Sequence, residues 1–146
     1  MGCGCPRIRL AVGTTRLATG STLVKAQQTQ TVLIVDDEDL VRMIGAEILQ
    51  DGGYRVLEAA CAVDALACLE RGSEVMVLFT DINMPGSPDG LGLAQLVHDR
   101  WPQVKILVAS GQVRPGPGDL PEKGLFLSKP YRSEELLAQI QALTTP

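Results

Sequence analysis

Five polar residues of this sequence lie at or just after the ends of short apolar runs, and their side chains suit the binding of a cation together with an anion. They are Asp36, Asp37, Asp81, Ser110 and Lys129. In an open parallel sheet, ligands bind beyond the carboxyl ends of the strands, where the strand order reverses. Adjacent strands lie about 4.8 Å apart, so the three carboxylates converge on one pocket if their strands are neighbours.

Three clustered carboxylates repel one another, by roughly 3 kcal/mol for each pair at a separation of about 5 Å and an effective dielectric near 20. Either one carboxyl group stays protonated or a cation lies among them. An oxygen-only ligand set with room for water is typical of Mg²⁺. Such a cation would neutralise an incoming phosphoryl group, for which a carboxylate can serve as acceptor. Lys129 and the Ser110 hydroxyl would then hold the remaining phosphoryl oxygens.

Alternating strand and helix patterns are predicted to position these residues. Strands are expected at residues 32–35, 54–58, 75–80, 104–109 and 125–127, and helices at residues 39–51, 63–70, 91–100 and from residue 133 onward. In the first helix, Val41, Ile44 and Ile48 recur at helical spacing, and Gly52 and Gly53 follow its predicted end. The alternation implies right-handed crossovers and a parallel sheet covered on both faces.

The stretch between Gly111 and Gly124 lacks the helix that this alternation requires. It contains Pro115, Pro117 and Pro121, and a proline inside a helix costs about 3 kcal/mol or more. We therefore expect a long loop in place of the fourth helix.

Length and charge narrow the classes of protein. The chain has 146 residues and a formal net charge of −4, which suit a single domain and disfavour a nucleic-acid surface, because such a surface needs a clustered basic face. No apolar run reaches the length of about 18 residues that a membrane span needs. The four cysteines lack metal-ligand spacing and are expected to be free thiols, so a cytoplasmic location is predicted.

Residues 1–30 differ from the rest of the chain. They contain no Asp or Glu and many Thr, Ser, Gly and Gln residues. No continuous apolar segment of the secretory type is present, because basic residues interrupt it. We expect a flexible N-terminal tail here, followed by one domain over residues 31–146.

Four segments resemble, in order, the motifs of bacterial two-component response regulator receiver domains. They are VLIVDD at Val32–Asp37, TDINMP at Thr80–Pro85, Ala109–Ser110–Gly111 and Ser128–Lys129–Pro130. The resemblance covers about residues 31–145 and implies a doubly wound, flavodoxin-like α/β fold with five parallel strands in the order 2-1-3-4-5. The expected loop departs from the family pattern, because most receivers signal through a surface that includes the fourth helix.

The resemblance also implies a role for each residue of the site. Asp81 would accept a phosphoryl group from a histidine of a sensor kinase or a phosphotransfer protein, and Lys129 would pair with that group. Mg²⁺ would be held directly by Asp37 and Asp81, through water by Asp36, and by the backbone carbonyl of Asn83. These five residues would form the phosphorylation site.

The remaining implied roles concern the response to phosphorylation. Ser110 would move toward the phosphoryl group, and Phe126 matches the switch aromatic of the family. Asn83 and Gln112 match the positions that tune dephosphorylation. The domain would control an interaction with an unknown downstream protein, and it would have no enzyme activity beyond self-phosphorylation and autodephosphorylation.

Two other functions fit part of the pattern. A pseudo-receiver would bind partners without phosphorylation, although the complete acidic set argues against it. A phosphatase of the haloacid dehalogenase type also uses Asp, Ser or Thr, Lys and Mg²⁺, but its nucleophile lies on the first strand with another Asp two positions later. Here Asp36 is followed two positions later by Glu38. Mg²⁺-dependent phosphorylation at Asp81 distinguishes the three functions.

Overall fold

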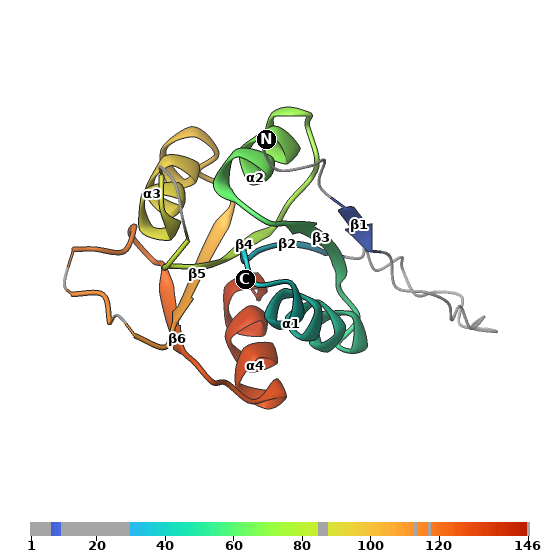
Figure 1. The fold of residues 1–146 in the computed structure, drawn as a ribbon. Helices are drawn as coiled ribbons and strands as arrows, with labels where there is room; N and C mark the ends of the chain where they lie inside the picture. Colours follow the sequence, from blue (N-terminus) through green and yellow to red (C-terminus); the bar gives the residue numbers. More distant parts are fainter. Residues whose placement is uncertain (1–6, 10–29, 85–87, 113, 117, 146) are drawn as a thin grey trace.

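The computed structural model describes residues 7–9, 30–84, 88–112, 114–116 and 118–145. These residues form an α/β fold with a central sheet of six strands. The strands are β1 (Arg7–Arg9), β2 (Thr31–Val35), β3 (Arg55–Ala59), β4 (Val77–Asp81), β5 (Lys105–Ser110) and β6 (Leu125–Ser128). The helices are α1 (Asp39–Asp51), α2 (Ala62–Glu70), α3 (Gly90–Arg100) and α4 (Ser133–Thr144). Strands and helices alternate from β2 to β5 (Figure 1), as the sequence patterns predict.

The strands from β2 to β6 are parallel and lie in the spatial order β3-β2-β4-β5-β6. This is the order 2-1-3-4-5 of a doubly wound sheet, so the predicted fold class is confirmed. The order reverses between β2 and β4, and Asp36 and Asp81 lie at the carboxyl ends of these two strands. The sheet topology alone therefore brings the acidic residues to the edge where ligands bind in such folds.

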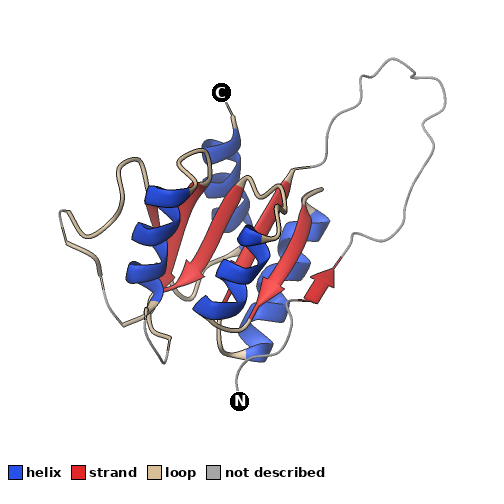
Figure 2. Ribbon diagram, turned by 90° about the horizontal axis from the view of Figure 1, so that it is seen from above, coloured by secondary structure: helices blue, strands red, loops and turns tan. Residues whose placement is uncertain are grey.

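Helices cover both faces of the sheet, as Figure 1 and Figure 2 show. α1 and α4 pack on one face, around a core that includes Leu49, Phe79 and Leu136. α2 and α3 pack on the other face, around a core that includes Leu78 and Leu93. Every residue of β2 and of β4 is buried, because central parallel strands have helices on both sides.

The side of α1 that faces the sheet is not the side on which Ile44 lies. The buried residues of α1 are Arg42, Gly45, Ala46 and Leu49. Ile44 is 50% exposed, whereas Ile48 packs partly against the core. The physical reason is close approach of the helix to the sheet, since a Cβ at Gly45 would lie only 2.7 Å from the Ile34 side chain.

A loop connects β5 to β6 where the alternation would place a helix. Residues 111–124 contain no helical residue among those that the structure describes, which confirms the predicted loop. The backbone N–H of Gly116 donates to the Asp119 carboxylate at 2.7 Å, and Gly118 has a φ of +89°, a conformation that glycine adopts without strain. The loop is thus built from tight turns that a helix could not contain.

β1 is an additional strand, for which the sequence patterns give no prediction. It pairs antiparallel with the outer edge of β3, with Ile8 opposite Leu57. Its three residues fall within residues 1–30, for which a flexible tail is predicted, and residues 1–6 and 10–29 lie outside the described part of the chain. A short strand from before residue 31 therefore adds to the edge of the sheet.

The cysteines and the lengths of the helices can be compared with what the sequence predicts. Cys68 is a buried free thiol, as expected. Cys61 is disulfide-bonded, which contradicts the expectation of a free thiol at that position, whereas Cys3 and Cys5 lie outside the described residues. Within the described ranges, no helix has the length and apolar character needed to cross a membrane.

Candidate functional site

Three carboxylates meet at the carboxyl end of the sheet, where the strand order reverses. Asp36 and Asp37 follow β2, and Asp81 is the last residue of the neighbouring strand β4. One oxygen atom from each carboxylate lies within 4.8 Å of the other two. Asp36 and Asp81 are buried, whereas Asp37 is exposed. The convergence that the sequence predicts is present, with Asp37 on the solvent side.

Lys129 supplies positive charge to this cluster. Its Nζ lies 3.0 Å from Oδ2 of Asp36 and 3.3 Å from Oδ1 of Asp81. Its backbone N–H donates to the carbonyl of Ser110 at 3.0 Å, which fixes the end of β6 beside the end of β5. Burial lowers the pKa of Lys129, but the hydrogen bonds and negative charges of the two aspartates outweigh burial and raise it. The ammonium group therefore stays charged.

The Asp81 carboxylate is less favourably placed for ionisation. Burial is the main cause that raises its pKa, and the negative charge of Asp36 adds to the effect. The positive charge of Lys129 and a hydrogen bond from the backbone N–H of Asn83 lower the pKa, but by less in total. One ammonium group is shared by two buried carboxylates and offsets the charge of only one of them. A further cation would offset the remaining negative charge.

The backbone around Asp81 is held by close packing. Thr80 Oγ1 donates to the Asp81 carbonyl at 3.0 Å. Gly90, the first residue of α3, lies so near that a Cβ on it would overlap the Asp81 carbonyl oxygen and stand 2.6 Å from Cα of Ile82. Asp89 caps α3 by accepting the Gly92 N–H at 2.9 Å. Only glycine fits where α3 begins beside the candidate acceptor.

Ser110, Asn83 and Gln112 border the carboxylates in different ways. Ser110 ends β5 one residue beyond Ala109, which pairs with Asp81 in the register of the sheet. It is buried, and its Oγ accepts the backbone N–H of Gln112 at 3.1 Å. The residues Asn83 and Gln112 are exposed. The structure thus brings Ser110 to the same sheet edge and leaves the other two at the solvent boundary.

Phe126 contacts the loop that stands in place of the fourth helix. It lies on β6 opposite Val108 and packs partly buried against the core on the side of α2 and α3. The guanidinium carbon of Arg114 lies 5.5 Å from the centroid of the Phe126 ring, within the range of a cation–π interaction. The predicted switch aromatic therefore has a loop arginine, rather than a helix, as its neighbour.

Comparison with known proteins agrees with this arrangement. A family model described as "Response regulator receiver domain" matches residues 32–141. The chain belongs to the response regulator receiver family. The matched range contains every residue of the candidate site. Because of this match, the matched part of the chain is a receiver domain of two-component signalling. Such a domain is a signalling domain rather than a catalytic one.

Three similar proteins illustrate the range of the family. The chain is 37% identical over 119 residues to the sensor kinase CckA of Brucella abortus, covering 77% of this chain and 12% of the kinase. It is 32% identical over 116 residues to an NtrX-like response regulator of Rickettsia bellii, covering 73% of this chain and 23% of that protein. A solved response regulator receiver protein from Sinorhizobium medicae superposes with a TM-score of 0.71 at 26% identity, covering 80% of this chain and 94% of that one.

The receiver domain is thus only a small part of its curated relatives. The chain spans about an eighth of the first relative and about a quarter of the second. The activities of the longer proteins are not carried over.

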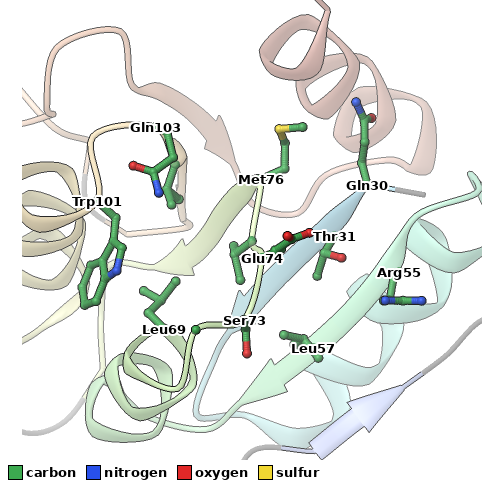
Figure 3. A pocket seen from close by; sticks show the side chains of 13 residues that line it. Gln30, Thr31, Arg55, Leu57, Leu69, Ser73, Glu74, Met76, Trp101 and Gln103 are labelled. Atoms are coloured by element: carbon green, nitrogen blue, oxygen red, sulfur yellow. The ribbon is translucent and has the colours of Figure 1, made fainter. Parts of the chain in front are cut away.

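A hollow of about 820 Å³ lies elsewhere on the receiver domain (Figure 3). Gln30, Arg55, Glu74 and Trp101 are among the residues that line it. These residues lie at the amino ends of the strands and beside α3, at the opposite end of the sheet from the carboxylates. The hollow is therefore not part of the candidate site.

Arg42, Glu58 and Gly90 belong to the structure of the site but do not stand out in the sequence. Arg42 and Glu58 are buried and hydrogen-bonded to each other. One signal could have indicated that Arg42 is buried. It lies on the same side of α1 as two small residues, Gly45 and Ala46. The close approach of Gly90 has no local signal, because it depends on the path of another strand.

The raised pKa of Asp81 predicts an effect on stability in metal-free buffer. Asp81→Asn should raise the free energy of unfolding at neutral pH by about 0.5–2 kcal/mol, a usual size for a stabilising substitution. A raised pKa means that the ionised form is disfavoured in the folded state. The wild-type protein should therefore gain stability as the pH falls through the raised value toward that of an ordinary aspartate, and the difference from the variant should shrink.

Urea unfolding with EDTA between pH 4 and pH 8 measures this difference. Asp51→Asn, at an exposed aspartate near the end of α1, is the matched control and should show no such trend. An Asp81→Asn protein that is less stable than the wild type at neutral pH would contradict the prediction.

Proposed function

We propose that this receiver domain, within residues 31–146, accepts a phosphoryl group on Asp81 from a histidine of a sensor kinase or phosphotransfer protein. The observation that carries the proposal is the contact of one ammonium group with two buried carboxylates, Asp36 and Asp81, beside the exposed carboxylate of Asp37. The arrangement offers an acceptor oxygen, a fixed positive charge and a place for a metal ion. These are the parts that phosphoryl transfer needs.

The donor set fits Mg²⁺. Asp37 and Asp81 would bind the ion directly, Asp36 through water, and the backbone carbonyl of Asn83 would complete the protein ligands. All of these donors are oxygen atoms, and because Asp37 is exposed, Mg²⁺ bound there would keep some of its own water ligands, as it usually does. When bound, the ion supplies positive charge that offsets the negative charge of the phosphoryl oxygens.

The residues of the chain account for the transfer step. An Oδ atom of Asp81 forms a bond to phosphorus, and the bond from phosphorus to the donor's imidazole nitrogen breaks. The electron pair of that bond stays on the imidazole, which takes up a proton. Lys129 would turn its ammonium group toward a phosphoryl oxygen, and the Ser110 hydroxyl would leave the Gln112 N–H and donate to another.

After transfer, residues at the border of the pocket would control the lifetime of the acyl phosphate. Asn83 and Gln112, both exposed, would govern how water reaches it and so set the rate of autodephosphorylation. Phe126 would change its contact with Arg114 and alter the binding of a downstream protein in the cytoplasm. No nucleic acid or membrane is part of this proposal.

A small acyl-phosphate donor tests the acceptor directly. We expect incubation with acetyl phosphate and Mg²⁺ to add one phosphoryl group to the protein, seen by intact mass spectrometry, with acetate as the leaving group. Asp81→Asn should show no adduct, because the amide is not a nucleophile for phosphorus. Asp51→Asn, which removes an exposed carboxylate on α1, should be labelled like the wild type.

The same experiment distinguishes the alternatives. A folded wild-type protein without any adduct would contradict the proposal and favour a pseudo-receiver. An adduct that persists in Asp81→Asn would place the acceptor elsewhere. Turnover of unrelated phosphomonoesters would favour a phosphatase of the haloacid dehalogenase type.

A further inference from the structure

Arg42 is a buried arginine at the base of the acidic turn. Its exposed fraction is 6%, and the guanidinium donates in three directions. Nη1 donates to the backbone carbonyl of Asp36 at 2.7 Å, Nε to Glu58 Oε1 at 3.1 Å, and Nη2 to Asp39 Oδ1 at 2.8 Å. One side chain on α1 thus joins the end of β2, the end of β3 and the first turn of its own helix.

The contact with Asp36 controls more than one residue. Its carbonyl belongs to the peptide group that links Asp36 to Asp37, so a hydrogen bond to it fixes the plane from which both carboxylates project. The Asp36 side chain is held as well, because its Oδ1 accepts the backbone N–H of Glu38 at 3.0 Å. Two of the three carboxylates therefore depend on the orientation of one peptide group.

Glu58 gives the guanidinium a fixed position. It is 4% exposed and lies on β3 opposite Ile34, two residues before Asp36 on the neighbouring strand. A buried guanidinium without its carboxylate would be strongly destabilising, because removing one partner of a buried ion pair leaves an uncompensated charge. Burial lowers the pKa of Arg42, but the bonds with Asp39 and Glu58 outweigh burial and raise it. The cation thus stays charged and in place.

We propose that Arg42, held by Glu58, is a positioning residue that orients the Asp36–Asp37 peptide for binding of Mg²⁺. The inference rests on the proposed function, since it concerns the same metal pocket. Arg42 itself donates its hydrogen bonds to oxygen atoms outside the ion's direct ligands. Its effect on the ion passes through the peptide group, as partners of metal ligands act in other sites.

The test is the Mg²⁺ affinity of the full chain, measured by isothermal titration calorimetry without any phosphoryl donor. Arg42→Met keeps much of the length of the side chain and removes all three hydrogen bonds. We expect it to bind Mg²⁺ about 10–100-fold more weakly, the range found for partners of metal ligands. Val104→Ala, at a buried position just before the start of β5, lowers stability far from the pocket and should bind Mg²⁺ like the wild type.

Arg42→Lys keeps the test sharp if Arg42→Met fails to fold. A lysine retains the charge beside Glu58, but its single ammonium group cannot reproduce the planar fork that reaches Asp36 and Glu58 together. We expect intermediate Mg²⁺ affinity. Glu58→Gln retains an oxygen that can accept from Nε and should stay closer to the wild type than Arg42→Met does.

The outcomes separate this inference from the proposed function. If the wild-type protein binds Mg²⁺ and a folded Arg42→Met or Arg42→Lys protein binds it with the same affinity, the role of Arg42 is overturned. The proposed acceptor chemistry is not affected by that result. A wild-type protein that binds no Mg²⁺ would overturn the metal part of the proposed function and this inference with it. Weaker binding in the arginine variants but not in Val104→Ala would support the inference.

Discussion

Lys129→Met is expected to slow phosphorylation by acetyl phosphate by about 10²–10³-fold, as found when one fixed donor to a developing charge is removed from an active site. The ammonium group lies 3.0 Å from Asp36 and 3.3 Å from Asp81, so it is already in place to meet a phosphoryl oxygen. Methionine keeps the apolar stem of the side chain and removes the charge. The rate of adduct formation by intact mass measures the loss.

The same substitution should also change how the protein responds to Mg²⁺. Without Lys129, the buried carboxylates of Asp36 and Asp81 repel each other without compensation, which we expect to cost about 2–4 kcal/mol of folding free energy, somewhat below a fully buried pair because the lysine is 20% exposed. A metal ion would then replace the lost charge. Saturating Mg²⁺ should therefore raise the melting temperature of the variant more than that of the wild type.

Lys105→Met is the matched control for both measurements. Lys105 is exposed at the amino end of β5, at the opposite end of the sheet from the carboxylates. It should leave the labelling rate and the effect of Mg²⁺ unchanged. Equal labelling of Lys129→Met and the wild type would contradict the assigned role of Lys129.

Gly90→Ala is expected to destabilise the fold by about 2–3 kcal/mol, toward the upper end of the usual cost of overpacking. The new methyl group would overlap the carbonyl oxygen of Asp81 and stand 2.6 Å from Cα of Ile82. Both neighbours are backbone atoms at the end of β4, which carries the candidate acceptor, so they cannot turn aside as a side chain would. Relief requires α3 and the end of β4 to move apart, and any share of that movement taken by β4 would displace Asp81.

Urea unfolding and labelling with acetyl phosphate should both detect this change. The control is Gly116→Ala in the β5–β6 loop, where the nearest atom to an added Cβ would be an Asp119 carboxylate oxygen at 3.5 Å. It should stay within about 0.5 kcal/mol of the wild type, as surface substitutions usually do. A Gly90→Ala protein of wild-type stability would show that α3 has room that the structure does not indicate.

The sheet and its acidic edge were predictable because they depend on local patterns. Runs such as Val32–Val35 mark strands buried on both faces, and alternation with helices then fixes a parallel sheet with few allowed topologies. Once β2 and β4 are neighbours, the acids that follow them must meet. The missing fourth helix was also predictable, since Pro115, Pro117 and Pro121 exclude it locally.

The features that escaped prediction depend on contacts between distant segments. Ile44 fits the periodicity of a buried side, yet α1 turns Arg42 inward because Glu58 and the Asp36 carbonyl are there to receive it. Gly90 is required by the path of Asp81, nine residues earlier in the chain. Neither partner can be identified from the residues next to it in the sequence.

The surroundings of Phe126 differ from the family pattern, because a loop stands between β5 and β6 in place of the fourth helix. Phe126 has the guanidinium of Arg114 over its ring, and Arg114 lies in the loop that follows Ser110, the last residue of β5. In the proposed function, a movement of Ser110 would reach Phe126 through this loop and its contact with Arg114. No rigid helix stands between the two among the described residues of this loop.

The pairing of β1 with β3 has a consequence for self-association. A strand at the edge of a sheet presents unpaired N–H and C=O groups, which can template the addition of a strand from another molecule. β1 covers that edge of β3 over Val56–Glu58. The parallel part of the sheet has two outer strands, β3 and β6, and among the described strands only the four-residue β6 has no further strand on its outer edge. A chain trimmed to the family match at residues 32–141 would lose β1 and expose β3 to intermolecular β-pairing, and with it to aggregation.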